Sequence, residues 1–100
     1  DVRVAADGRR AMDMIESFAP AVVVLDYHLP GQTGLELYRE MVRRRARPIN
    51  CVMVTGYPLE KIAQPANQAG IHYLLCKPFS LLELQRLIDR IAGEVPRVSH

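Results

Sequence analysis

The chain has 100 residues, with 13 Lys+Arg against 11 Asp+Glu and a formal net charge of +2 at pH 7. This length fits one small domain, and an apolar share of 49% is too high for a disordered segment. The near-balance of charge argues against a general nucleic-acid or membrane-surface binder, and no apolar run approaches the roughly 20 residues that a membrane span needs. Cys51 and Cys76 lack metal-type spacing, so we expect no zinc site or disulfide framework, and a reduced, cytoplasmic setting.

Four short apolar runs predict β-strands, and helical patterns separate them. The runs are residues 2–5, 21–25, 51–54 and 72–75. The second and third are almost wholly apolar and β-branched, which is typical of parallel strands covered on both faces. Apolar residues at helical spacing begin near Ala11, Leu35 and Leu81. Because strands and helices alternate, the sequence predicts an α/β domain with a parallel sheet.

Local signals indicate where several helices begin and end. Two capping boxes, at residues 33–36 and 80–83, predict the starts of the second and last helices. Phe79 and Leu84 are spaced to form a hydrophobic staple at the second box. The third helix, near residues 59–69, contains Pro65, which predicts a kink or a split into two short pieces. Gly70 is expected to cap its end.

Polar side chains follow three of the predicted strands. Asp26 follows residues 21–25, Thr55 follows residues 51–54, and Lys77 comes two residues after the last strand. Each alone fits a turn residue, a helix cap or a solvated lysine. The carboxyl ends of parallel strands meet at one edge of a sheet, however, so we expect the three in one polar site. A carboxylate attacks phosphoryl groups, and an ammonium and a hydroxyl can bind phosphoryl oxygens, which predicts acyl-phosphate chemistry.

These residues stand in motifs that resemble the receiver domain of two-component response regulators, of the chemotaxis-receiver type. The matching segments are residues 6–8, 24–37, 54–57, 68–70 and 77–79, in family order. The resemblance covers residues 1–92, which would form the receiver domain, and leaves residues 93–100 as a C-terminal tail. It implies a flavodoxin-like, three-layer αβα fold with a parallel sheet.

The resemblance also implies a role for each site residue. Asp26 would be the phosphoacceptor, and Thr55 and Lys77 would bind phosphoryl oxygens, with Thr55 moving on activation. The main-chain carbonyl of His28 would join Asp26 as a ligand of Mg²⁺, and the bond before Pro78 would be cis. The chain would then be a cytoplasmic signalling module, not an enzyme, that takes its phosphoryl group from a sensor histidine kinase or a phosphotransfer protein.

The sequence departs from the family in two places. The family's first strand, the acidic pair at its end and the first helix, about 25–30 residues, have no counterpart before Asp1, so we expect about four strands and four helices and no further acidic Mg²⁺ ligands. Asp7 matches a different family position. Leu74 stands where the family often has an aromatic residue, and Tyr73 lies one step earlier, on the opposite face of the strand.

Other functions remain open. Without the acidic pair, the chain could be a phosphorylation-independent interaction module on a receiver scaffold, whereas Asp26, Thr55 and Lys77 favour the phosphoacceptor. A phosphatase of the aspartyl-phosphate type ranks last, because it needs a second Asp where His28 stands. The basic run at residues 43–47 complements a helix dipole and lacks the aromatic residues of a nucleic-acid site.

The absent unit also predicts how the chain assembles. The first strand is expected to pair directly with residues 21–25. Part of the apolar stripe on the last helix would be exposed, so we expect a homodimer with that helix at or near the interface. The stripe comprises Leu81, Leu84, Leu87, Ile88 and Ile91.

Overall fold

The computed structural model describes residues 2–5, 7–17, 22–45 and 49–94. The strands are β1 (Val2–Ala5), β2 (Val22–Asp26), β3 (His28–Leu29), β4 (Gln32–Thr33), β5 (Cys51–Thr55) and β6 (Tyr73–Cys76). The helices are α1 (Gly8–Ser17), α2 (Gly34–Arg45), α3 (Leu59–Ala69) and α4 (Leu81–Glu94).

Four parallel strands form the central sheet in the order β1-β2-β5-β6. The first strand pairs directly with the second, with Val2 opposite Val22, as predicted. The long runs of buried residues in β2 and β5 fit their central positions, since both faces of these strands are covered. This strand order brings the carboxyl ends of β2, β5 and β6 to one edge.

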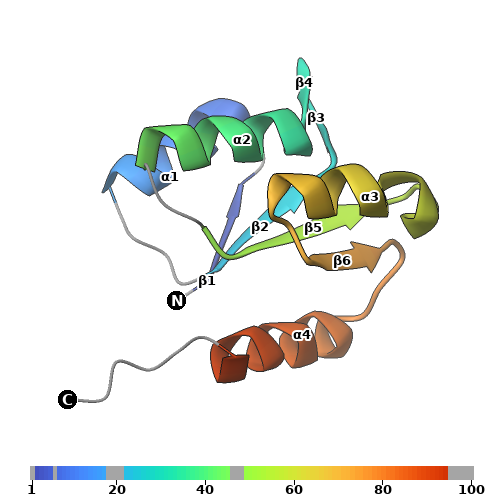
Figure 1. The fold of residues 1–100 in the computed structure, drawn as a ribbon. Coiled ribbons are helices and arrows are strands. Elements are labelled where there is room, and N and C mark those ends of the chain that lie inside the picture. The colour runs from blue at the N-terminus through green and yellow to red at the C-terminus, as the bar shows by residue number, and fades with distance from the viewer. Residues whose placement is uncertain (1, 6, 18–21, 46–48, 95–100) are drawn as a thin grey trace.

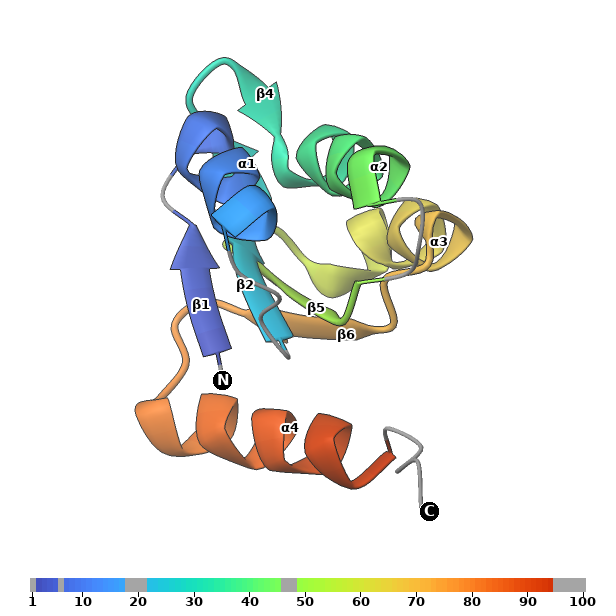
Figure 2. The same ribbon diagram turned by 90° about the vertical axis from the view of Figure 1, so that its left-hand side faces the viewer.

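The helices cover the two faces of the sheet unequally. The helices α1, α2 and α3 lie on one face and α4 lies on the other (Figures 1 and 2). Because side chains alternate along a strand, Val23 and Leu25 pack into the larger core, and Val22 and Val24 pack toward α4. Ile91 of α4 is buried in this second cluster, with Leu84 and Leu87 packed against it. These layers give the flavodoxin-like α/β arrangement.

The predicted capping boxes are confirmed. Of the two effects predicted for Pro65, a kink or a split, the split does not occur. Thr33 Oγ1 accepts a hydrogen bond from Glu36 N–H at 3.1 Å, and Ser80 Oγ accepts one from Glu83 N–H at 3.1 Å. The helix α3 runs unbroken through Pro65 to its left-handed cap at Gly70. A proline removes one backbone donor. Two buried residues of the same helix, Ile62 and Ala66, anchor it to the core on both sides of that loss.

A small antiparallel hairpin, β3–β4, was not predicted. Two-residue strands are too short to show a period of two, so no pattern in the sequence reveals them. Gly31 turns the hairpin with a positive φ of 79°. The hairpin follows β2 directly and leads into α2, so it shapes the loop after Asp26. Among the described residues, no helix is long and apolar enough to cross a membrane.

Candidate functional site

Asp26 and Lys77 meet at the carboxyl edge of the sheet, as the sequence predicts. Asp26 is the last residue of β2, and Lys77 directly follows β6. The Lys77 Nζ donates a hydrogen bond to Asp26 Oδ2 and forms an ion pair with it. The two strands are separated by β5, so the pair spans the site across the end of that strand. Both side chains are partly exposed, which leaves the carboxylate accessible to a reactant.

The other oxygen of the Asp26 carboxylate has its own donor. His28 N–H donates to Asp26 Oδ1 at 2.9 Å. The backbone just after Asp26 is also held, because Tyr27 N–H donates to the Val54 carbonyl at 2.8 Å. The carboxylate is therefore oriented from both sides, and hydrogen bonds to charged groups are stronger than those between neutral groups.

Thr55 is completely buried and belongs to the framework of the site. Its Oγ1 accepts a hydrogen bond from Tyr57 N–H at 2.9 Å, and its carbonyl accepts one from Lys77 N–H at 2.7 Å. The strand β5 thus fixes the backbone of Lys77 directly. A hydroxyl that accepts one hydrogen bond still carries its own hydrogen for donation to another oxygen.

A cavity of about 400 Å³ opens beside the ion pair. Asp26, His28 and Lys77 line its polar end, and apolar residues of β1, β2, β3, β5 and α4, together with Phe79, line the rest. The sequence predicted one polar pocket for Asp26, Thr55 and Lys77. Thr55 does not line this cavity, although its neighbour Val54 does. The reason is that consecutive strand residues point to opposite faces, and Thr55 points away from the face that Val54 occupies.

Three rings gather beside the carboxylate, and sequence reasoning missed them. The ring centroids of His28 and Tyr57 lie 4.6 Å apart, and those of His28 and Tyr27 lie 5.3 Å apart, both edge to face. Their positions in the sequence could have indicated the cluster, since all three lie within two residues after Asp26 or Thr55, at the ends of adjacent strands.

Few side chains near Asp26 are of the kind that ligate metal ions. None of the described residues makes a group of three or more His, Cys, Asp or Glu side chains suited to a metal. The Asp26 carboxylate and the His28 carbonyl provide two oxygen ligands, and water commonly supplies several of the six that Mg²⁺ takes. Asp7 is engaged elsewhere, because its Oδ1 accepts the Arg10 N–H at 2.8 Å at the start of α1.

The backbone and side chains around β6 have the arrangement that the sequence indicates. The Lys77–Pro78 bond is cis, as the resemblance implied. Tyr73 packs toward α4 and Leu74 toward the larger core, so the two do lie on opposite faces of the strand. Cys51 and Cys76 are both free thiols, as expected.

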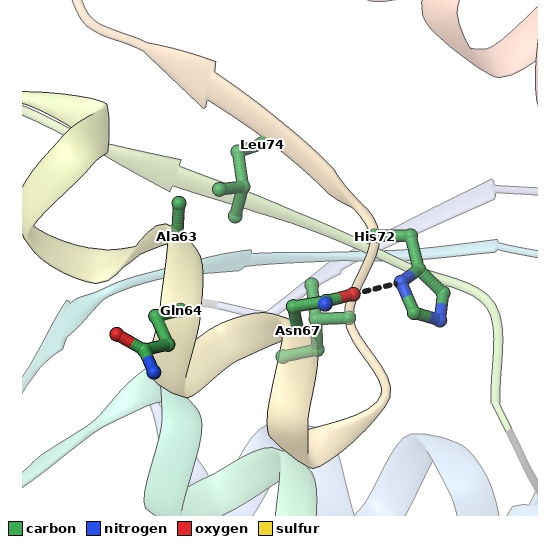
Figure 3. Close-up of a pocket in the computed structure, with 6 residues that line it drawn as sticks. Ala63, Gln64, Asn67, His72 and Leu74 are labelled. Atoms are coloured by element: carbon green, nitrogen blue, oxygen red, sulfur yellow. Dashed lines mark hydrogen bonds between the residues drawn. The ribbon is translucent and has the colours of Figure 1, made fainter.

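A second cavity, of about 430 Å³, lies between α3 and β6 (Figure 3). Ala63, Ile71 and Leu74 give it apolar walls, and His72 Nδ1 lies 2.6 Å from Asn67 Oδ1 at its rim. Its lining includes no carboxylate and no lysine. This cavity therefore lacks the charged pair that lies beside the first cavity.

The basic run at the end of α2 is engaged in pairing. Arg43 pairs with Glu40, and Arg44 bonds Glu16 of α1 at 2.9 Å. Arg45 donates to the Ile15 carbonyl at 3.0 Å. The contacts of Arg44 and Arg45 tie α2 to α1, a role beyond the expected interaction with the helix dipole. Position 47 lies outside the described residues.

Comparisons with known proteins agree with this geometry. The chain is 31% identical over 85 residues to the transcriptional regulatory protein PdtaR of Mycobacterium tuberculosis, covering 85% of this chain and 40% of that protein. It is 32% identical to a LuxR-family DNA-binding response regulator of Staphylococcus aureus, with a TM-score of 0.72 over 85% of this chain and 70% of that chain. The NtrX receiver domain of Brucella abortus shares the fold, with a TM-score of 0.82, 23% identity and coverage of 94% and 99%.

The chain spans about 40% of the length of the curated relatives that it matches first. The profile of the response regulator receiver domain matches residues 1–89. The parallel sheet, the paired Asp26 and Lys77 at its carboxyl edge and the sequence matches all lead to one conclusion: the chain belongs to the family of response regulator receiver domains.

Proposed function

We propose that the chain accepts a phosphoryl group on Asp26 and signals through a change of conformation. One observation carries this proposal: the Asp26 carboxylate lies at the carboxyl edge of the sheet, paired with Lys77 and open to an adjacent cavity. A carboxylate oxygen attacks the phosphorus of a phosphohistidine, the P–N bond breaks, and the imidazole leaves with the electron pair of that bond. The product is an aspartyl phosphate.

The neighbouring groups suit the charge that this step delivers. Lys77 already lies on one carboxylate oxygen, so its ammonium can shift to a phosphoryl oxygen by a small side-chain movement. Thr55 carries a hydroxyl hydrogen for a second phosphoryl oxygen, which it reaches only by moving out of its buried position. We propose that this movement of Thr55 carries the signal, because its hydroxyl also holds Tyr57 N–H.

The partner that fits this chemistry is a sensor histidine kinase or a phosphotransfer protein carrying phosphohistidine, in the cytoplasm. The role is that of a signalling module and not of an enzyme, with slow self-dephosphorylation at most. Direct nucleic-acid binding is not part of the proposal, because the described arginines at the end of α2 contact neighbouring groups of the protein.

A second candidate is a phosphorylation-independent interaction module on the same scaffold. The oxygen donors at the site favour it, because the described residues offer Mg²⁺ only the Asp26 carboxylate and the His28 carbonyl. In that case Asp26 and Lys77 would form a permanent ion pair and the partner would bind the unmodified chain.

Phosphorylation by a small donor separates the two candidates. The chain is incubated with acetyl phosphate, with and without magnesium, and its mass is measured. We expect the wild type to gain one phosphoryl group and Asp26→Asn to gain none, because an amide keeps the shape of the side chain but is a poor nucleophile. Asp13→Asn, at an exposed position on α1, is the matched control and should label like the wild type.

Two outcomes would contradict the phosphoacceptor. Equal labelling of Asp26→Asn would assign the acceptor to another residue. No labelling of a folded wild type under any condition would favour the second candidate. A thermal unfolding curve for each variant shows whether a loss of labelling reflects a loss of fold.

A further inference from the structure

Gly34, the first residue of α2, packs directly on the backbone of Asp26. A Cβ built on Gly34 would overlap the Asp26 carbonyl oxygen, and it would lie 3.1 Å from the carbonyl carbon and 2.8 Å from Met53 Sδ. Real Cβ atoms essentially never approach another heavy atom more closely than 3.0 Å. Any side chain at this position must therefore displace both the Asp26 carbonyl and Met53 Sδ, or move α2 away from them.

The two neighbours differ in how easily they move. Met53 Sδ lies near the end of a flexible side chain and can rotate away. The Asp26 carbonyl belongs to the backbone of β2, which is paired with β1 on one side and β5 on the other. A side chain at Gly34 would therefore shift either α2 or the residue that we propose as the phosphoacceptor.

Several contacts fix the approach of Gly34 to Asp26. Gly34 N–H donates to the Tyr27 carbonyl at 2.7 Å. The β3–β4 hairpin pairs His28 with Thr33, and the capping box between Thr33 and Glu36 fixes the first turn of α2. The chain therefore leaves Asp26, turns, and returns to contact the same residue through a closed and hydrogen-bonded loop.

Comparison with the other glycines shows that the requirement at Gly34 is one of backbone space. Gly8 is also crowded, but a Cβ there would meet the end of the flexible Gln32 side chain. Gly31 and Gly70 have positive φ values of 79° and 104°, so they are favoured for their backbone conformation. Gly56 and Gly93 have nothing within 4 Å of a built Cβ. Gly34 has no positive φ, yet its Cβ position is filled by the backbone of Asp26.

We propose that Gly34 is a positioning residue for phosphoryl transfer. By carrying no side chain, it lets the start of α2 rest on the Asp26 carbonyl and sets the Asp26 carboxylate against Lys77. This inference rests on the proposed function of Asp26. It assigns to α2 a direct part in the geometry of the site, although no side chain of that helix lines the cavity beside Asp26.

The test compares labelling by acetyl phosphate in the full chain. We expect Gly34→Ala to be phosphorylated at least about tenfold more slowly than the wild type, because misplacement of a reacting group by about 1 Å costs on the order of a hundredfold. Gly93→Ala makes the same chemical change in open space on α4 and should label at the wild-type rate.

A second variant separates positioning from simple core packing. Met53→Val removes the sulfur that an alanine at position 34 would meet and leaves the Asp26 carbonyl in place. We expect Gly34→Ala combined with Met53→Val to recover folding, measured by thermal unfolding, but to stay slow in labelling. Recovery of labelling to the rate of Met53→Val alone would show that Gly34 matters only for core packing, and would overturn the inference.

An independent readout keeps the inference testable if the wild type is not labelled. In ¹H–¹⁵N spectra, displacement of Asp26 should shift the amide signals of Tyr27 and His28 in Gly34→Ala, and in the double variant, and leave them in place in Gly93→Ala. Unlabelled wild type with shifted signals would reject the proposed function alone. Unshifted signals together with normal labelling would reject the positioning role alone.

Discussion

Asp7 and Asp26 both lie near the carboxyl ends of neighbouring strands, yet their carboxylates have different partners. Asp26 pairs with Lys77, and Asp7 accepts the backbone N–H of Arg10 as a helix cap. A capping carboxylate faces its own helix, so we expect Asp7 not to act as a metal ligand beside Asp26. The oxygen ligands near Asp26 are therefore few.

We predict weak binding of Mg²⁺ by the unphosphorylated chain. With one carboxylate and one carbonyl as ligands, half-saturation should require concentrations on the order of millimolar or above. Isothermal titration calorimetry measures the affinity for Mg²⁺. Asp7→Asn should leave the titration unchanged, because asparagine also caps a helix. Binding on the order of micromolar that disappears in Asp7→Asn would show that Asp7 does act as a ligand.

The buried thiol of Cys51 makes alkaline pH destabilising. Burial raises the pKa of Cys51 above its ordinary value of 9.0, and burial likewise raises the pKa of Tyr38 above 10.0. Above about pH 9 the unfolded chain loses the thiol proton while the folded chain keeps it. The unfolded state then binds fewer protons, so stability falls as pH rises.

We expect this loss to approach about 1.4 kcal/mol per pH unit for the thiol alone, once the pH is well above 9. Urea unfolding of the wild type and Cys51→Ala at pH 7, 9 and 10 measures it. At pH 7 the variant should be less stable than the wild type, because replacing Cys51 by alanine leaves a cavity. The difference in free energy of unfolding between the two proteins should decrease as pH rises. A difference that is constant across this range would contradict the prediction.

At the scale of elements, the two capping boxes were predictable because every group involved lies within four residues of sequence. The β3–β4 hairpin and the unbroken α3 were not predictable in the same way. The hairpin has no periodicity to detect, and the effect of Pro65 depends on tertiary anchoring by Ile62 and Ala66. Local rules thus located helix starts well and failed where packing overrides them.

The two capping boxes can be compared by making the same kind of substitution at the start of α2 and at the start of α4. Thr33→Ala and Ser80→Ala should each lower the free energy of unfolding by about 0.5–2 kcal/mol, since each removes a side-chain acceptor at a helix start. Urea unfolding measures both. Thr33→Ala should also slow phosphorylation of Asp26 more than Ser80→Ala does, because α2 rests on the Asp26 backbone through Gly34, whereas α4 contributes only apolar side chains to the adjacent cavity. Equal slowing by both variants would trace the effect to stability alone.

The candidate site was partly predictable for a topological reason. Parallel strands place Asp26 and Lys77 at one edge whatever the details of the loops, and the ion pair confirms that they meet. The burial of Thr55 away from the cavity, the ring cluster with His28 and Tyr57, and the contact of Gly34 depend on the path of each loop. Strand periodicity carries no information about that path.

At the scale of the whole molecule, the helices cover the two faces of the sheet unequally. Among the described residues, three helices lie on one face and α4 lies on the other (Figure 2). Val4 on the edge strand is 68% exposed, and Leu81 at the start of α4 is 83% exposed. The edge of β1 also offers backbone groups for pairing. We therefore propose that two chains associate through β1 and the start of α4.

We predict a homodimer with two-fold symmetry at micromolar concentration, measured by sedimentation velocity. Leu81→Glu should shift the population toward monomer, because a charge would be buried at the interface. Gln68→Glu places the same side chain at an exposed position on α3, on the other face, and should leave the dimer intact. A monomeric wild type would reject this assembly.

The ion pair between Asp26 and Lys77 joins residues 51 positions apart in the sequence. It can form only after β2, β5 and β6 have assembled side by side, so it is among the contacts that carry a high entropic cost of loop closure. A nascent chain still lacking β6 would expose the aspartate without its lysine. If Asp26 is the phosphoacceptor, as we propose, its pairing with Lys77 requires the completed sheet, and we expect a partly synthesised or partly unfolded chain not to take phosphoryl groups from partner proteins.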